Sequence, residues 1–221
     1  HGARNSRHNS KLPELPNRPY LRTLNERKQP WYLDRKKYGI LSDRDIEDYG
    51  TADGILGGHP DATRIPGVEA STGSLGHGFP SAVGLALGLR IRDQNNRVFV
   101  LVGDGECHEG TVWEAAHVAN NLELGNLCVI VDWNGSAAQL MPQDNLPEKW
   151  KAFGWDTYRI DGHNMEDIMN TLLLPMHSNK PRVIIADTVK GKGVSFMEGE
   201  KAWHGVSPSE KDFNNALKEL E

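Results

Sequence analysis

Short, almost uninterrupted apolar runs are the strongest constraint on the fold of this chain. Residues 97–102 (RVFVLV), 127–131 (LCVIV) and 182–189 (RVIIADTV) are too short for buried helices and rich in β-branched side chains. Strands that are apolar on both faces are typical of parallel sheets, because helices cover both sides of such sheets. A weaker run at residues 155–160 predicts one more strand.

Helical patterns alternate with these strands. Asn164 is expected to cap one helix, and Ser207 followed by Pro208 is expected to begin the last one. The alternation predicts an α/β fold, a doubly wound parallel sheet with helices on both faces. The predicted helices are residues 74–92, 109–122, 165–174 and 207–220.

The start of the chain lacks this regularity. Residues 1–54 are rich in Arg, Lys, Asn and Pro, and we expect about the first thirty to be irregular. Residues 38–49 predict one short helix, with Ser42 as its cap and Asp45 three residues later. We therefore expect an irregular N-terminal segment at residues 1–54 and one α/β domain at residues 55–221.

The overall composition excludes several classes of protein. The 221 residues suit one large domain, and the net charge of −5 argues against binding to nucleic acid. No apolar stretch is long enough to span a membrane, and the N-terminus lacks the apolar core of a signal peptide. Two cysteines make no disulfide framework, and Cys128 lies in an apolar run as a reduced core thiol. We therefore expect a cytoplasmic protein.

Two loops at strand ends predict a metal site. Residues 103–105 (GDG) follow one strand, and residues 132–136 (DWNGS) follow the next. In parallel sheets, ligands bind outside the carboxyl ends of the strands, where Asp104 and Asn134 would both lie. Magnesium takes one or two protein oxygens and completes its shell with phosphate oxygens. A lone GDG is a common turn, so the pairing with Asn134 carries the prediction.

Three histidines are candidates for binding or catalysis. His59 and His77 lie in one glycine-rich stretch that leads into a helix, where backbone N–H groups can face an anion or a ring. His204 follows residues 190–193 (KGKG), which indicate either a solvated turn or a mobile loop that closes on phosphate.

Six motifs together resemble the diphosphate-binding half of the transketolases. The resemblance is greatest to the split form of that family, in which an N-terminal subunit pairs with a separate C-terminal subunit. The resemblance covers about residues 55–221, and the motifs are, in order, GHPDATRIPGVEASTGSLGHG, GDGECHEGTVWEA, VDWNG, IDGHN, TVKGKGVSFME and WHGVSPSE. It implies a domain of the thiamine diphosphate-binding fold that holds the cofactor and Mg²⁺, with Ca²⁺ or Mn²⁺ as substitutes.

The resemblance also implies roles for individual residues. The metal would be bound by Asp104, Asn134 and the backbone carbonyl of Ser136. The cofactor would be contacted by Gly73, Leu75, Gly103, Gly105, Glu106, Asn134 and His204, with His1 as a remnant of a further histidine loop. His59 would face the ketose hydroxyls, His204 the donor substrate, and Glu109 an acidic network that reaches the partner.

The chain departs from the family in two places. Residues 136–142 (SAAQLMP) replace the stretch that usually follows the asparagine, and the N-terminal part with its two histidine loops is missing, truncated or divergent. The resemblance implies transfer of a two-carbon ketol unit between sugar phosphates. It also implies a C-terminal partner subunit that carries the pyrimidine-binding domain, in a heterotetramer, without which this chain is inactive.

Three other functions remain open. A 1-deoxyxylulose-phosphate synthase has much of the same cofactor-binding half. The α subunit of a 2-oxoacid dehydrogenase E1 has the same Gly-Asp-Gly motif followed by an asparagine. Residues 66–78 (PGVEASTGSLGHG) argue against the second of these. A structural partner without catalytic activity could have kept the same fold.

Overall fold

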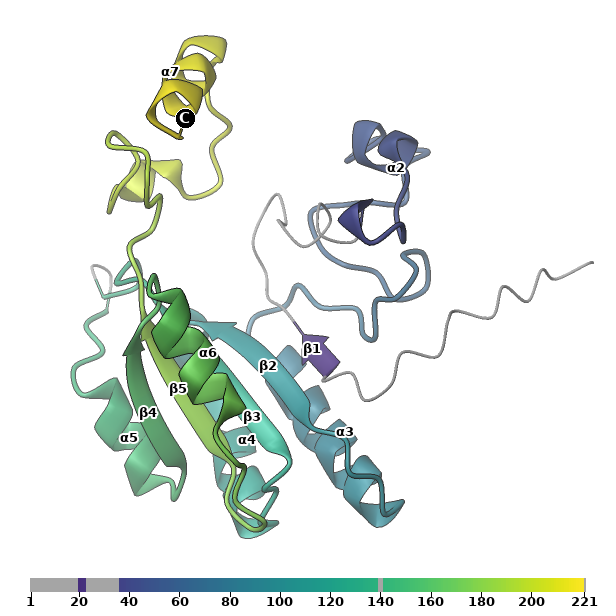
Figure 1. Ribbon diagram of the computed structural model, residues 1–221, viewed down its shortest axis with the longest axis vertical. Helices are drawn as coiled ribbons and strands as arrows, with labels where there is room; N and C mark the ends of the chain where they lie inside the picture. Colours follow the sequence, from purple (N-terminus) through teal and green to yellow (C-terminus); the bar gives the residue numbers. More distant parts are fainter. Residues whose placement is uncertain (1–19, 23–35, 139–140, 221) are drawn as a thin grey trace, which may run out of the picture.

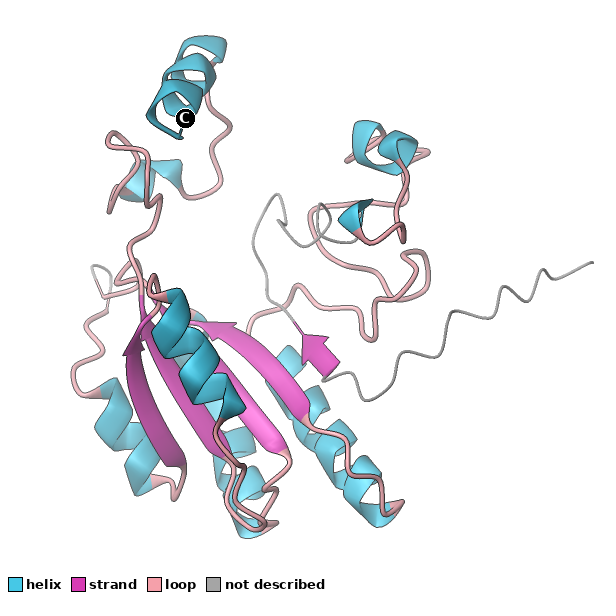
Figure 2. Ribbon diagram, in the orientation of Figure 1, coloured by secondary structure: helices cyan, strands magenta, loops and turns pink. Residues whose placement is uncertain are grey.

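The computed structural model describes residues 20–22, 36–138 and 141–220. Figures 1 and 2 show one open sheet flanked by helices. The described elements are, in chain order, β1 (Tyr20–Arg22), α2 (Asp43–Glu47), α3 (Gly78–Ile91), β2 (Val98–Gly103), η1 (Glu106–His108), α4 (Gly110–Asn121), β3 (Leu127–Trp133), α5 (Leu146–Ala152), β4 (Asp156–Asp161), α6 (Met165–Leu173), β5 (Arg182–Asp187), η2 (Lys201–Trp203) and α7 (Glu210–Leu220).

The sheet is parallel throughout, with the order β1-β2-β3-β5-β4. Gly103 of β2 lies beside Asp132 of β3, and Trp133 of β3 lies beside Asp187 of β5. The carboxyl ends of the three central strands therefore meet at one edge of the sheet. This arrangement confirms the predicted α/β fold and brings together the loops that carry the candidate ligands.

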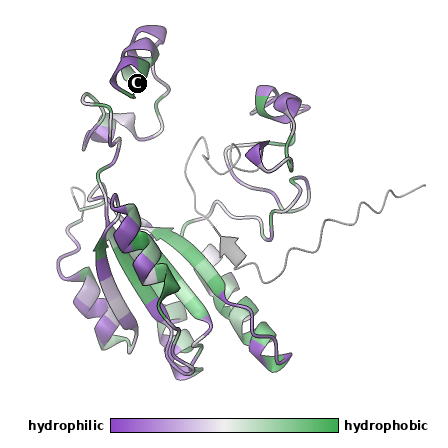
Figure 3. Ribbon diagram, in the orientation of Figure 1, coloured by the Kyte–Doolittle hydropathy of each residue, from purple (hydrophilic) through white to green (hydrophobic). Residues whose placement is uncertain are grey.

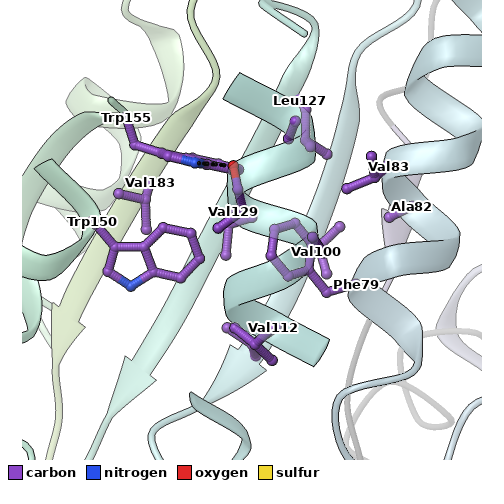
Figure 4. Close-up of a cluster of buried hydrophobic side chains, with 14 of the residues drawn as sticks. Phe79, Ala82, Val83, Val100, Val112, Leu127, Val129, Trp150, Trp155 and Val183 are labelled. Atoms are coloured by element: carbon purple, nitrogen blue, oxygen red, sulfur yellow. Dashed lines mark hydrogen bonds between the residues drawn. The ribbon is translucent and has the colours of Figure 1, made fainter. Parts of the chain in front are cut away.

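One face of the sheet is covered by α3, α4 and α5. Phe79 of α3, Trp150 of α5 and Trp155 are buried together, with ring centroids 4.9–6.0 Å apart. Trp155 also donates a hydrogen bond from its indole Nε1 to the carbonyl of Ala116 at 3.0 Å, which ties it to α4. Figure 4 shows these side chains packed against the valines of the central strands, so this is the larger core.

The opposite face is covered by α6. Figure 1 shows this helix in front of the sheet and α4 behind it. Phe99, Cys128 and Ile184 are buried on this face. Along the sheet, the step from β4 to β5 runs in the opposite direction to the step from β2 to β3. Because both connections are expected to be right-handed, their helices, α6 and α4, lie on opposite faces of the sheet. Figure 3 shows the central strands as the most hydrophobic part of the chain.

The structure corrects two predicted helix starts. The helix expected from residue 74 begins at Gly78, because Gly73 and Gly76 have φ angles of +149° and +77°, which are outside the helical region. The last helix begins at Glu210, and its cap is Ser209 in place of Ser207. Ser209 and Asp212 exchange capping-box hydrogen bonds, with Ser209 N donating to Oδ2 at 3.3 Å and Asp212 N donating to Oγ at 3.2 Å.

Besides the short 3-10 helices η1 and η2, one described strand and one described α-helix were not predicted. Tyr20–Arg22 form β1, within the segment that we expected to be irregular, because their backbone pairs with the edge of β2. Helix α5 was missed because it is seven residues long and has only two buried anchors, Leu146 and Trp150.

Other expectations are confirmed. Ser42 and Asp45 form the predicted capping box of α2, and the side chain of Asn164 accepts hydrogen bonds from Glu166 N and Asp167 N at the start of α6. A small core of Leu41, Leu56 and Ile65 supports the loops before α3. In the part of the chain that the structure describes, no helix is long and apolar enough to cross a bilayer. The boundary between residues 54 and 55 stays a prediction.

Both thiols should be inert in the folded protein. Cys107 and Cys128 are each 1% exposed. Burial raises the pKa of Cys128 to about 12 and raises that of Cys107 as well, so neither forms the reactive thiolate at pH 8. Ellman's reagent should therefore titrate no thiol in the native protein and both thiols in denaturant. Fast reaction of the native protein would contradict the packing around β2 and β3.

Candidate cofactor and metal site

Asp104 lies directly after β2 and its side chain is almost completely buried, with 5% exposed. Its Oδ1 accepts a hydrogen bond from Gly105 N at 2.8 Å, and its Oδ2 accepts one from Ala137 N at 3.3 Å. Its own backbone N–H donates to the carbonyl of Asp132 at 3.0 Å, which extends the pairing of β2 and β3. Within the described residues the carboxylate forms no ion pair. A buried carboxylate without a cation is costly, so the site suits a bound cation.

Asn134 lies just beyond the end of β3, the strand that pairs with β2. Its Oδ1 accepts a hydrogen bond from Ser136 N at 3.0 Å. Ser136 and Ala137 are consecutive in one turn, which begins after Gly135 at a φ of +74°. Their N–H groups therefore hold one oxygen of Asn134 and one oxygen of Asp104 against the same turn. The structure thus brings the predicted metal ligands Asp104, Asn134 and Ser136 to one place.

The donor set fits a magnesium diphosphate. Among residues 36–138 and 141–220, no three His, Cys, Asp or Glu side chains converge as a closed metal site would require. A single carboxylate, an amide oxygen and a backbone carbonyl leave positions open for phosphate oxygens, which Mg²⁺ prefers to a cage made of protein alone. Gly103 borders open space, and a Cβ at Gly105 would lie 3.7 Å from the Cβ of Ala137. The backbone of this loop is therefore open at Gly103 and within ordinary van der Waals distance of the turn at Gly105.

Glu106 joins the metal loop to the glycine-rich loop before α3. Its Oε1 accepts a hydrogen bond from Gly76 N at 2.9 Å, and Thr111 Oγ1 donates to the carbonyl of Gly76 at 2.9 Å. A Cβ on Gly76 would lie 2.3 Å from that hydroxyl, so only glycine fits. Burial raises the pKa of Glu106, although hydrogen bonds from Gly76 and Gly103 oppose the rise. The cofactor role predicted for the backbone at Glu106 stays a prediction, and its side chain holds Gly76.

His59 lies directly against Gly73. A Cβ on Gly73 would come within 2.7 Å of the imidazole Cγ, so the ring occupies the space that a side chain would need. Hydrogen bonds from Ala62 N to Ser71 Oγ at 3.0 Å and from Thr72 N to the Pro60 carbonyl at 3.3 Å hold the two segments together. His59 is exposed, and its predicted contact with the substrate stays a prediction.

Among the described residues, the structure shows no hydrogen bond between the side chains of the other predicted residues and the loops that carry Asp104 and Asn134. Leu75 is 41% exposed, and His77 and Glu109 are exposed as well. Glu109 is the N-cap residue of α4 and its side chain makes no cap hydrogen bond there. His204 is exposed in the loop after η2, which Figure 1 shows beyond the carboxyl ends of the strands. His1 lies outside the described residues. The roles of all of these residues stay predictions.

Two polar residues at the site could not be identified from the sequence alone. Asp132 accepts a hydrogen bond from Asn134 Nδ2 at 3.0 Å, and the hydroxyl of Thr188 donates to the other oxygen of Asp132. Asp132 lies within the VDWNG motif, but nothing in the sequence distinguished it from any other polar residue at the end of a strand. Thr188 comes from the end of β5, and only the strand order brings it there.

The chain matches the family described as "Transketolase, thiamine diphosphate binding domain" over residues 36–220. It is 37% identical over 195 residues to an apulose-4-phosphate transketolase subunit of Phocaeicola vulgatus, a match that covers 86% of this chain and 69% of the relative. It is 39% identical over 173 residues to the 6-deoxy-6-sulfo-D-fructose transketolase subunit SqwG of a Clostridium species, a match that covers 76% of this chain and 63% of the relative.

Solved structures show the same fold. The transketolase of Leishmania mexicana superposes with a TM-score of 0.79 at 26% identity over 93% of this chain, and that of Campylobacter jejuni with a TM-score of 0.78 at 28% identity over 91%. The chain spans only about a third of those proteins, 33% and 34%. The chain therefore belongs to the transketolase family, and the part of the family that it contains is the thiamine diphosphate-binding domain.

Proposed function

We propose that this chain is the N-terminal subunit of a split transketolase that depends on thiamine diphosphate and Mg²⁺. The observation that carries the proposal is the turn at residues 135–137, which holds the side-chain oxygens of Asp104 and Asn134 together at the ends of two adjacent strands. Two relatives, of which this chain covers 69% and 63%, have names that call them subunits of transketolases, which supports a division of the enzyme between two chains.

In the proposed site, Asp104, Asn134 and the Ser136 carbonyl would hold the metal, which would neutralise the charge of the diphosphate. Residues 103–106 approach the diphosphate through their backbone, while Gly73 and Leu75 contact the rings of the cofactor. When bound, thiamine diphosphate supplies the electron sink that cleavage of a ketose between C2 and C3 requires. This chain contributes the binding and orientation of that cofactor.

The exposed histidines, His59 and His204, are proposed to contact the substrate. His59 lies against Gly73, and its imidazole is proposed to exchange a proton with a hydroxyl of the sugar. His204 is proposed to donate a hydrogen bond to diphosphate and to the donor substrate. Glu109 is proposed to join a network of acids that continues in the partner. These exposed positions suit a site that a second chain completes.

The proposed partner is a C-terminal subunit that carries the pyrimidine-binding domain, in a heterotetramer with two copies of each chain. The proposed reaction moves a two-carbon ketol unit from a ketose phosphate to an aldose phosphate in the cytoplasm. Because two relatives are named for apulose 4-phosphate and for 6-deoxy-6-sulfo-D-fructose, these two sugars are included among the substrates to be tested.

Reconstitution tests this proposal directly. The chain alone, with thiamine diphosphate, Mg²⁺ and a panel of ketose donors with ribose 5-phosphate as acceptor, should show no turnover, because the reactive end of the cofactor needs the second chain. Addition of the C-terminal subunit should produce ketol transfer, measured as formation of the longer ketose. Turnover by the chain alone would contradict the split site, and no metal-dependent cofactor binding by the mixture would favour a structural role.

A further inference from the structure

We infer that Thr188 and Asp132 are positioning residues that fix which end of the Asn134 amide faces the metal. The inference rests on the proposed function and adds two residues outside the predicted ligand set. It concerns the orientation of a ligand, and neither residue is proposed to touch the metal, the cofactor or the substrate.

The first step is the orientation of Asn134. Its Nδ2 donates to Asp132 Oδ2 at 3.0 Å. A carboxylate accepts hydrogen bonds, so the NH₂ end of the amide has to face Asp132. The oxygen end then points the other way, where it accepts from Ser136 N at 3.0 Å on the turn that also holds Asp104. The reversed amide would present N–H groups to the metal, which a cation rejects.

The second step is the orientation of Asp132 itself. Its Oδ1 accepts a hydrogen bond from the Thr188 hydroxyl, and its Oδ2 is used by Asn134. Each carboxylate oxygen therefore has its own donor, and tilting the group out of its present plane would break both bonds. Thr188 comes from the end of β5, where its backbone N–H also donates to the Trp133 carbonyl at 3.3 Å. The ends of β3 and β5 are thus joined by backbone and side-chain bonds.

The third step is the orientation of Thr188. A Cβ on Gly162 would lie 2.4 Å from the methyl Cγ2 of Thr188, so the methyl occupies the space left by the missing side chain. Gly162 N also donates to the Asp187 carbonyl at 2.8 Å, which holds the two loops together. The methyl and the hydroxyl of Thr188 are both bonded to its Cβ, so one χ1 angle sets the direction of both groups. Seating the methyl against Gly162 therefore directs the hydroxyl to Asp132. This gives the IDGHN motif a role that the metal ligands alone do not explain.

The consequence is a preformed ligand. The chain of contacts runs from Gly162 through Thr188 and Asp132 to Asn134. Partners of this kind, one step removed from the metal, typically change metal affinity by about 10–100-fold when they are removed. Loss of the Thr188 hydroxyl should leave the fold intact and weaken metal binding within that range.

The test compares Thr188→Val, which keeps the shape and loses the hydroxyl, with Thr188→Ser, which keeps the hydroxyl. Each variant is prepared as the complex with the C-terminal subunit. Mn²⁺ is titrated in the presence of thiamine diphosphate, and free Mn²⁺ is measured by electron paramagnetic resonance. Thr188→Val should raise the Kd for Mn²⁺ by about tenfold or more, whereas Thr188→Ser, which keeps the hydroxyl and loses only the methyl that directs it, should raise the Kd by a clearly smaller factor. Asp132→Asn should weaken binding at least as much as Thr188→Val, because an amide at 132 lets Asn134 reverse.

The thermal midpoint of the metal-free complex separates positioning from a structural role. A variant that lowers this midpoint and keeps the parent Kd for Mn²⁺ would overturn the inference. So would equal losses of affinity in Thr188→Val and Thr188→Ser. If Thr188→Val fails to fold, Asp132→Asn decides, and parent affinity there would also overturn it. The proposed function fails separately, if the parent complex itself takes up no Mn²⁺ with thiamine diphosphate.

Discussion

Replacement of Asp104 by alanine is expected to abolish metal-dependent binding of thiamine diphosphate. Asp104 is the one carboxylate in the proposed ligand set, and it is buried with only backbone N–H groups as described partners. Its removal should weaken cofactor binding by more than about 100-fold, since even the outer partners of a metal ligand change affinity by about 10–100-fold. Calorimetry of the two-subunit complex with thiamine diphosphate, with and without Mg²⁺, measures the loss.

Glu114→Ala is the matched control for this experiment. Glu114 is another acid on the same domain, but it is exposed on α4. Its replacement should leave Mg²⁺-dependent binding unchanged. Retention of the cofactor by Asp104→Ala at the parent affinity would refute the metal site, whereas a loss in both variants would indicate a general effect of charge.

Replacement of Trp150 by alanine is expected to lower the free energy of unfolding more than any other substitution proposed for this chain. The side chain is fully buried, and its ring contacts those of Phe79, Trp113 and Trp155 with centroids 4.9–6.0 Å apart. Truncation removes one of the two buried anchors of α5 and leaves a large cavity, which typically costs about 3–5 kcal/mol. Urea unfolding of the chain, followed by far-ultraviolet circular dichroism, measures the difference in free energy of unfolding.

Trp150→Phe tests the reason for that loss. The indole Nε1 of Trp150 is buried and has no hydrogen-bond partner among the described residues. Phenylalanine keeps an aromatic ring and removes the unpaired N–H, so the lost packing is partly offset by a lower desolvation cost. The phenylalanine variant should therefore be clearly more stable than the alanine variant. Equal losses in the two variants would mean that the ring packing does not determine the stability of α5.

The strands and the loops after them could be predicted because their signals are local. Apolar runs of β-branched residues predicted β2, β3 and β5 to within two residues at each end, and the GDG and DWNGS loops follow them directly. Local capping patterns likewise predicted Ser42 and Asn164. The last helix shows the limit of such signals, because Ser207 with Glu210 and Ser209 with Asp212 both fit the capping-box pattern, and only the structure shows that the second pair forms.

By itself, the sequence determined the fold class and the place of Asp104 and Asn134 at the ends of adjacent strands. The tertiary structure decided which residues support them. Asp132 and Thr188 are 56 residues apart, and Glu106 and Gly76 are 30 apart. The first pair meets because β5 lies between β3 and β4 in the sheet. That order depends on how the helices pack on the two faces, and such long-range contacts leave no periodic pattern along the chain.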